Sequence, residues 1–151
     1  MNFFKYIEEN INNTIDLYID MDGVLAEYDI GNFDYNSIRP INTTIEIVSE
    51  LIKKGVNVKI LSVCKKNIII DEKNKWIKRN MPFFDIKNAI YISKEEINKN
   101  ISSKELKSNY LKNNINKNNV NIVVDDDNEI IKYLKNNNKD IKLFQVSSLI
   151  K

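Results

Sequence analysis

Two carboxylates separated by one residue directly follow an apolar run near the start of the chain. Positions 17–26 read Leu-Tyr-Ile-Asp-Met-Asp-Gly-Val-Leu-Ala, which places the pair at Asp20 and Asp22. Burying carboxylates at the end of a strand costs free energy unless a cation pairs with them. Gly23 permits a sharp turn immediately after the pair. The segment therefore predicts a cation-binding loop at the end of a strand.

Further polar groups stand where other β-branched runs end. Ser62 closes one such run, and the pair Asp125 and Asp126 closes another. In an open parallel sheet, ligands bind in the crevice at the carboxyl ends of the strands. We therefore expect these side chains to lie opposite the first acidic pair, with the acids forming a metal site.

Short β-branched runs alternate with longer segments of helical period, which is typical of a parallel sheet with crossover helices. The expected strands are 15–20, 56–62, 89–92, 120–125 and 142–146. The expected helices are 44–54, 67–80, 103–113 and 128–137, with a short opening helix at 3–11. We predict an α/β fold in one domain over residues 1–151, a three-layer α/β/α sandwich around a five-stranded parallel Rossmann-like sheet.

The composition excludes several classes of function. The 151 residues are 42% hydrophobic, which is enough apolar material for the core of one domain. Lysine and arginine number 23 against 21 acidic residues, and the net charge of +2 is spread along the chain, so dedicated nucleic-acid binding is not expected. Histidine is absent, which removes Ser-His-Asp hydrolysis and imidazole-dependent zinc sites. Catalysis must therefore use carboxylates, hydroxyls and lysines.

No targeting or membrane segment is recognisable in the sequence. The first residues lack the basic start and apolar run of a signal peptide, and no window approaches the roughly 20 apolar residues of a transmembrane helix. The single cysteine, Cys64, cannot form an internal disulfide. These features predict a cytoplasmic protein with no membrane partner, and they leave open whether it forms a homo-oligomer.

In chain order, these motifs resemble those of the haloacid dehalogenase superfamily. Its first motif, an Asp-x-Asp run after the first strand, is matched by Asp20 and Asp22. Its second, a hydroxyl that closes the second strand, is matched by Ser62. Its fourth, an acidic pair after the fourth strand, is matched by Asp125 and Asp126. The resemblance implies the superfamily's Rossmann-like fold, and a carboxylate at the position of Asp22 is what its phosphatases carry.

The third motif of the superfamily is a lysine, for which the sequence offers several candidates. Lys94, Lys104 and Lys107 fall between the third and fourth expected strands. Lys107 is preferred, because the run Leu-Lys-Ser-Asn-Tyr-Leu at 106–111 resembles a Lys-Ser-Asp-Tyr run found in bacterial relatives. Lys94, just after the third strand, is the second choice.

The resemblance implies a Mg²⁺-dependent phosphomonoester hydrolase. Asp20 would be the nucleophile that forms an aspartyl-phosphate, and Asp22 would be the general acid and base. Ser62 and the motif lysine would bind the oxygens of the transferred group. The metal ligands would be Asp20, the main-chain carbonyl of Asp22 and Asp126, with Asp125 holding the lysine or a metal-bound water.

The string Asp-Met-Asp-Gly-Val-Leu-Ala at 20–26 most resembles the 5′(3′)-deoxyribonucleotidases, which implies a nucleoside monophosphate as substrate. Those enzymes carry a helical cap after the first motif, whereas only residues 27–44 precede the next expected helix here. We therefore expect a minimal cap or none, with 27–44 as a short lid loop over an open site. Substrate contacts are predicted from Gly23, Ser62, Tyr28 and Arg39, and Phe33 and Tyr35 are further aromatic residues of the lid.

Two other functions remain open at this point. An open site also fits a bulky substrate such as a nucleic-acid 3′-phosphate or a phosphoprotein, and a basic groove leading to Asp20 would favour a nucleic acid. A receiver-like, phosphate-sensing binding domain also uses acidic residues, a hydroxyl and a lysine on a doubly wound sheet. In receivers, however, the phospho-accepting aspartate closes the third strand, where this chain has Ser93 and Lys94.

Overall fold

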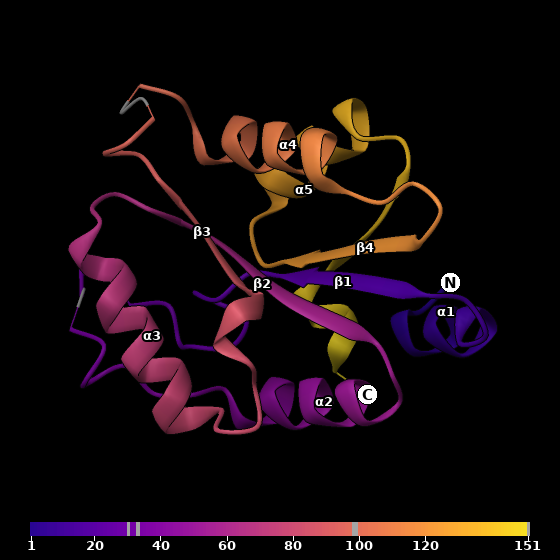
Figure 1. Cartoon of the computed structure of the whole chain (residues 1–151), viewed down its shortest axis with the longest axis horizontal. Helices are drawn as coiled ribbons and strands as arrows, with labels where there is room; N and C mark the ends of the chain where they lie inside the picture. The colour runs from indigo at the N-terminus through magenta and orange to yellow at the C-terminus, as the bar shows by residue number, and fades with distance from the viewer. Residues whose placement is uncertain (30, 33, 98–99, 151) are drawn as a thin grey trace.

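A five-stranded parallel sheet forms the centre of the molecule (Figure 1). The computed structural model describes residues 1–29, 31–32, 34–97 and 100–150. The strands are β1 Ile15–Ile19, β2 Asn57–Cys64, β3 Ala89–Ser93, β4 Val120–Asp125 and β5 Ile141–Gln145. They are arranged in the order β3-β2-β1-β4-β5. The predicted parallel α/β fold is therefore confirmed.

Strand β1 lies in the middle of the sheet, and all five of its residues are buried. Its last residue, Ile19, is in register with Ile60 of β2 and with Val124 of β4. The two neighbouring strands therefore reach the same edge of the sheet as the Asp-x-Asp turn. A receiver of the flavodoxin-like type has the order 2-1-3-4-5, so the strand order argues against the receiver-like alternative.

Helices cover both faces of the sheet (Figure 1). They are α1 Phe3–Asn10, α2 Asn42–Lys53, α3 Ile68–Asn80, α4 Ser103–Asn114 and α5 Asn128–Asn137, with short 3₁₀ turns η1 Ile86–Asn88 and η2 Val146–Leu149. Successive side chains of a strand point to opposite faces. Accordingly, Leu17 and Ile19 pack in a cluster with α1, α2 and α3, whereas Tyr18 packs with α4 and α5. This is the predicted three-layer sandwich.

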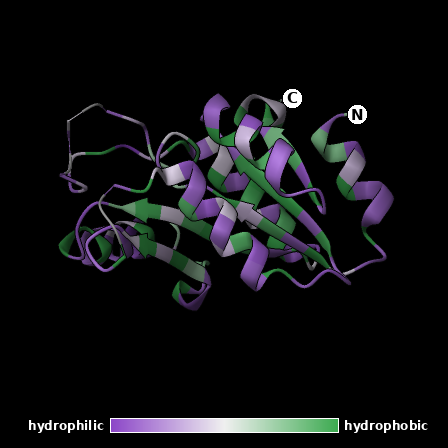
Figure 2. Cartoon of the chain, turned by 90° about the horizontal axis from the view of Figure 1, so that it is seen from above, coloured by the Kyte–Doolittle hydropathy of each residue, from purple (hydrophilic) through white to green (hydrophobic). Residues whose placement is uncertain are grey.

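Apolar residues are concentrated on the strands, and the outward sides of the helices are hydrophilic (Figure 2). Helix α2 ends at Lys53, and Gly55 follows with a φ of +91°, the left-handed conformation that glycine adopts at helix C-termini. Within the described residues, no helix is both long and apolar enough to cross a membrane.

Most elements begin or end one or two residues from the predicted bounds, and β2 continues two residues past Ser62 to Cys64. Strand β5 begins at Ile141 and ends at Gln145, one residue earlier at each end, because Ile141 packs into the core and Val146 starts η2. Helix α2 begins at Asn42, so the loop after the Asp-x-Asp turn ends at residue 41 and not 44. We call residues 27–41 the covering segment; Phe33, predicted to belong to the lid, lies outside the described residues.

Candidate active site

A tight backbone turn follows β1 and orients the first acidic pair. The N–H of Asp20 donates to the carbonyl of Val124 at 3.1 Å, which extends the β1–β4 pairing by one residue. The carbonyl of Met21 then accepts hydrogen bonds from the N–H groups of Val24, Leu25 and Ala26, and the N–H of Gly23 donates to the carbonyl of Ala26 at 2.8 Å. The turn is thus held by its own backbone, and its acidic side chains are free to face the pocket.

Three carboxylates converge at the edge of the sheet. Asp20, Asp125 and Asp126 each offer an oxygen within 4.8 Å of the other two. Burial raises the pKa of Asp20 to about 7, and repulsion from the neighbouring carboxylates adds to the shift. Burial and Asp125 also raise the pKa of Asp126 to about 6. The crowding leaves the acids short of positive charge, which a bound divalent cation supplies.

The backbone around this cluster also fits a bound metal. Gly23 has a φ of +84°, and a Cβ placed on it would lie 2.0 Å from Oδ2 of Asp126. Only a residue without a side chain lets the turn approach that carboxylate so closely. Oxygen ligands on a tight turn are the donor set that Mg²⁺ prefers. The residues present therefore fit a Mg²⁺ site made by the predicted ligands.

Lys107, the preferred motif lysine, lies against this cluster. Its ammonium is buried and lies 2.7 Å from Oδ2 of Asp125 and 3.2 Å from Oδ1 of Asp20. Burial alone lowers the pKa of a lysine, but the two carboxylates raise the pKa of Lys107 above its usual value. Lys94, the second choice, lines the same pocket. Its backbone N–H donates to the carbonyl of Cys64. The geometry therefore favours Lys107 for the third motif.

A second buried lysine, Lys73 of α3, was missed by the sequence analysis. Its ammonium lies 3.0 Å from Oδ2 of Asp22 and 2.6 Å from the hydroxyl of Ser62. A signal for it was present, because Lys73 occupies the same helical stripe as the apolar Ile69, Trp76 and Ile77. A lysine on the apolar face of a helix must find a buried partner.

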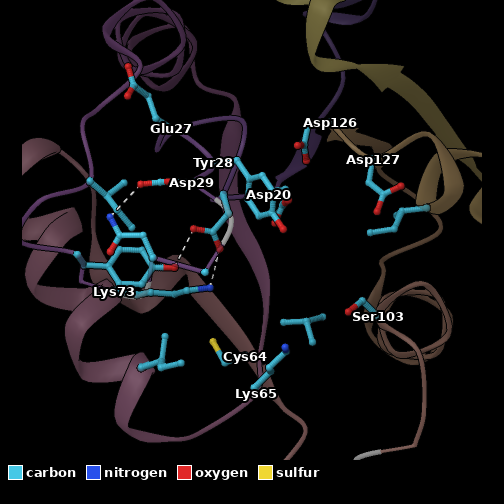
Figure 3. A pocket seen from close by; sticks show the side chains of 18 of the residues that line it. Asp20, Glu27, Tyr28, Asp29, Cys64, Lys65, Lys73, Ser103, Asp126 and Asp127 are labelled. Atoms are coloured by element: carbon cyan, nitrogen blue, oxygen red, sulfur yellow. Dashed lines mark hydrogen bonds and ion pairs between the residues drawn. The ribbon is translucent and has the colours of Figure 1, made fainter.

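One open pocket of about 700 Å³ is lined by Asp20, Asp22 and Asp126 and by both lysines (Figure 3), whereas Asp125 is buried and not among the lining residues. Tyr28 lines this pocket and is 66% exposed. Ser62 lies behind the lining, fully buried against Lys73. Arg39, which was predicted to contact the substrate, is exposed and is not among the lining residues, and its carbonyl accepts a hydrogen bond from the N–H of Glu27 at 2.9 Å.

No protein-family model and no curated protein matches the chain. Solved structures do match. One is a chain of the "Structure of Pnkp1/Rnl/Hen1 complex", with a TM-score of 0.70 and 16% identity over 88% of this chain and 46% of that one. Another is a chain of the "Structure of the Pnkp1/Rnl/Hen1 RNA repair complex", with a TM-score of 0.66 and 13% identity over 89% of this chain and 42% of that one.

The likeness is one of fold alone. The chain spans less than half the length of either neighbour. At these identities the match confirms the α/β fold, and the resemblance to the haloacid dehalogenase superfamily stays a prediction from the motifs. The match gives no support to the nearer resemblance to the deoxyribonucleotidases, which stays a prediction.

The covering segment is fastened to α3 and carries one residue of the site. The indole N–H of Trp76 donates to the carbonyl of Ile38 at 2.9 Å, and Nη2 of Arg79 donates to the carbonyl of Tyr35 at 2.8 Å. The ring of Tyr35 is buried, and its hydroxyl donates to Oδ1 of Asp22 at 2.8 Å. The covering segment is thus anchored to α3 over its described part.

Replacing Trp76 by Phe is expected to lower the free energy of unfolding by about 2 kcal/mol or more, because the carbonyl of Ile38 loses its donor and the smaller ring leaves a void. Urea denaturation followed by circular dichroism measures the change. Ile68→Val, on the same helix at a 70% exposed position, is the control and should change stability by no more than about 0.5 kcal/mol. An equal effect of both variants would show that the anchor contributes nothing.

Proposed function

We propose that the protein is a Mg²⁺-dependent phosphomonoester hydrolase that works through an aspartyl-phosphate on Asp20. The observation that carries the proposal is the convergence of Asp20, Asp125 and Asp126 within 4.8 Å, with the Lys107 ammonium 3.2 Å from Asp20. A carboxylate nucleophile, a carboxylate two residues later and a buried cation at the end of one strand are the groups that phosphoryl transfer requires.

The metal would be held by the carboxylates of Asp20 and Asp126 and by the main-chain carbonyl of Asp22. When bound, it supplies positive charge that screens the anionic substrate from the anionic nucleophile. The Lys107 ammonium lies 3.2 Å from Asp20, where it would orient that carboxylate and donate to the oxygens of a bound phosphoryl group. Lys73 and the hydroxyl of Ser62 offer further donors on the other side of the pocket.

The reaction would take two steps. In the first, an oxygen of Asp20 forms a bond to phosphorus, the bond from phosphorus to the ester oxygen breaks, and Asp22 gives its proton to the departing alcohol. In the second, Asp22 takes a proton from water, the water oxygen bonds to phosphorus, and the bond to Asp20 breaks to release phosphate. Asp22 lines the pocket beside Asp20, where it can reach both the alcohol and the water.

The first substrate class that we propose is a nucleoside monophosphate, as the resemblance of the first motif implies. The pocket is open and large enough for a nucleotide, and Tyr28 at its mouth offers an aromatic face to a base.

A second candidate is a phosphate at the end of a nucleic acid, which the lysines at one side of the pocket favour. Lys65 and Lys94 line both the main pocket and an adjoining hollow of about 250 Å³, which Lys66 also lines. Over the ranges that the structure describes, none of these three ammonium groups pairs with a carboxylate. Figure 3 shows the Lys65 ammonium pointing into the pocket. The membership of one structural neighbour in an RNA repair complex supports the same candidate.

Phosphate release, measured with and without Mg²⁺, tests the proposal. The substrates are 5′- and 3′-nucleoside monophosphates, sugar phosphates and 3′-phosphorylated oligonucleotides. Mg²⁺-dependent release is expected, and its absence from every substrate would contradict the proposed reaction. Added salt decides between the two classes, because it weakens binding of an oligonucleotide much more than that of a mononucleotide.

Mg²⁺ is expected to raise the melting temperature, because it binds the crowded acids of the folded chain and not the unfolded chain. At 100 times its Kd, the metal stabilises by about 2.7 kcal/mol, or on the order of 7 °C for a chain of this size. Differential scanning fluorimetry measures the shift. Asp126→Asn should abolish the shift, whereas Asp140→Asn, at an exposed position far along the chain, should retain it. A full shift in Asp126→Asn would place the metal elsewhere.

A further inference from the structure

Both oxygens of the Asp22 carboxylate are held by separate donors. The hydroxyl of Tyr35 donates to Oδ1 at 2.8 Å, and the ammonium of Lys73 donates to Oδ2 at 3.0 Å. Two donors on opposite oxygens fix the plane of a carboxylate, whereas one donor leaves it free to rotate. Each oxygen keeps one lone pair for a further partner. Asp22 is therefore fixed in orientation and still able to exchange a proton with a bound group.

Among the described residues, Asp22 is the one carboxylate that forms an ion pair with Lys73, and the ammonium also lies 5.8 Å from the centre of the Tyr35 ring. The Lys73 side chain is 2% exposed, and its ammonium also lies 2.6 Å from the hydroxyl of Ser62. Figure 3 shows it entering the pocket from α3. Burying an ammonium is costly unless it is paired with a carboxylate and hydrogen-bonded. The Lys73 ammonium thus bridges the carboxylate of Asp22 and the hydroxyl of Ser62.

Helix α3 also fixes the position of Tyr35, the second donor to Asp22. Lys73, Trp76 and Arg79 follow one another at intervals of three residues, so they share a side of the helix. Trp76 and Arg79 hold the backbone of the covering segment at Ile38 and Tyr35. One helix therefore supplies the lysine directly and sets the position of the tyrosine through the segment it anchors.

We infer that Lys73 and Tyr35 are positioning residues that hold the Asp22 carboxylate toward the oxygen of the leaving group. The inference rests on the proposed phosphatase function. It assigns a role to the covering segment, which orients the acid through the Tyr35 hydroxyl. It also predicts a specific kinetic defect, because an acid out of position harms only those esters whose leaving group needs a proton.

A comparison of two phosphomonoesters distinguishes positioning of the general acid from binding of the phosphoryl group or maintenance of the fold. The departing group of an alkyl phosphate is a strongly basic alkoxide that must be protonated, whereas p-nitrophenyl phosphate releases a stable anion. Tyr35→Phe is expected to lower kcat for the alkyl phosphate by about 10- to 100-fold, which reaches the lower limit of the contribution of general acid catalysis because the acid is displaced and not removed. Its kcat for p-nitrophenyl phosphate should stay within about twofold of the wild type, with KM little changed for either ester.

The matched control is Tyr91→Phe. The Tyr91 hydroxyl also donates to α3, at Oδ1 of Asn74, but it does not contact Asp22. This variant removes a hydrogen bond of the same kind and should not change the ratio of the two kcat values. For the lysine, Lys73→Met keeps the length and burial of the side chain, and Lys73→Arg restores the charge. The first should show the selective loss, the second should recover part of it, and circular dichroism verifies that both are folded.

Each other outcome contradicts the inference. An equal loss on both esters would mean that Lys73 and Tyr35 bind the phosphoryl group or maintain the fold. No loss on either ester would mean that Asp22 needs no positioning. If the wild type hydrolyses neither ester with Mg²⁺, the proposed function fails and the inference fails with it, whereas an active wild type without the selective loss leaves the proposed function intact.

Discussion

Replacing Asp20 by Asn should abolish phosphate release, with a fall in kcat of at least about 10⁴-fold. The amide has nearly the same shape as the carboxylate, but it neither attacks phosphorus nor carries the charge that binds a metal. The folded state should tolerate the change, because burial already raises the pKa of Asp20 to about 7 and Lys107 keeps its contact with Asp125. Release from the best substrate of the panel, together with the melting temperature, measures both effects.

An acid quench during turnover adds a direct readout of this prediction. Mass spectrometry should detect a phosphoryl group on the peptide that contains Asp20 in the wild type and none in Asp20→Asn. Asp140→Asn, at an exposed position, controls for the loss of one negative charge and should keep full activity. Residual turnover of Asp20→Asn above about 1% of wild type would place the nucleophile on another residue.

Replacing Gly23 by Ala should destroy the metal site. The added Cβ would lie 2.0 Å from Oδ2 and 2.5 Å from Cγ of Asp126, so the carboxylate or the turn must move. The φ of +84° adds strain of about 1–2 kcal/mol for any residue with a side chain. Mg²⁺-dependent phosphate release should fall by at least about 100-fold, in line with the sensitivity of catalysis to a misplacement of 1 Å. The melting temperature of the variant should no longer respond to Mg²⁺.

Gly55→Ala isolates the steric part of this effect. Gly55 has a φ of +91°, but a Cβ there would meet nothing within 4 Å. This variant should lose only the stability that the backbone strain costs, about 1–2 kcal/mol, and should keep its activity and its response to Mg²⁺. If Gly23→Ala and Gly55→Ala behave alike, the close approach of the turn to Asp126 has no role in metal binding.

The fold and the acidic cluster could be predicted because both depend on local patterns. Each strand corresponds to a short β-branched run in the sequence. In a parallel sheet, the residues at the end of such a run lie near the edge where ligands bind. Asp20 follows β1 and Asp125 is the last residue of β4, whereas Ser62 lies two residues before the end of β2, and the structure brings all three to one pocket wall or directly behind it. The order of the strands carries no local signal, because it depends on which strands pair across the whole chain.

The parts of the site that were not predicted come from the helices and the covering segment. Lysines are almost never fully buried, and the partner of Lys73 is 51 residues away in the sequence. Tyr35 was placed in the lid, but its contact with Asp22 depends on the anchoring of the segment by α3. Arg39 was predicted to contact the substrate as part of the lid loop, but it is exposed and not among the residues that line the pocket.

The anchoring of the covering segment provides a natural optical probe. The chain has a single tryptophan, and its indole N–H is bonded to the segment at Ile38. The emission of an indole shifts to longer wavelengths when it loses a buried environment and meets water. Tryptophan emission therefore reports on the surroundings of Trp76, and a substrate that lifts the segment from α3 should register as a red shift without any label.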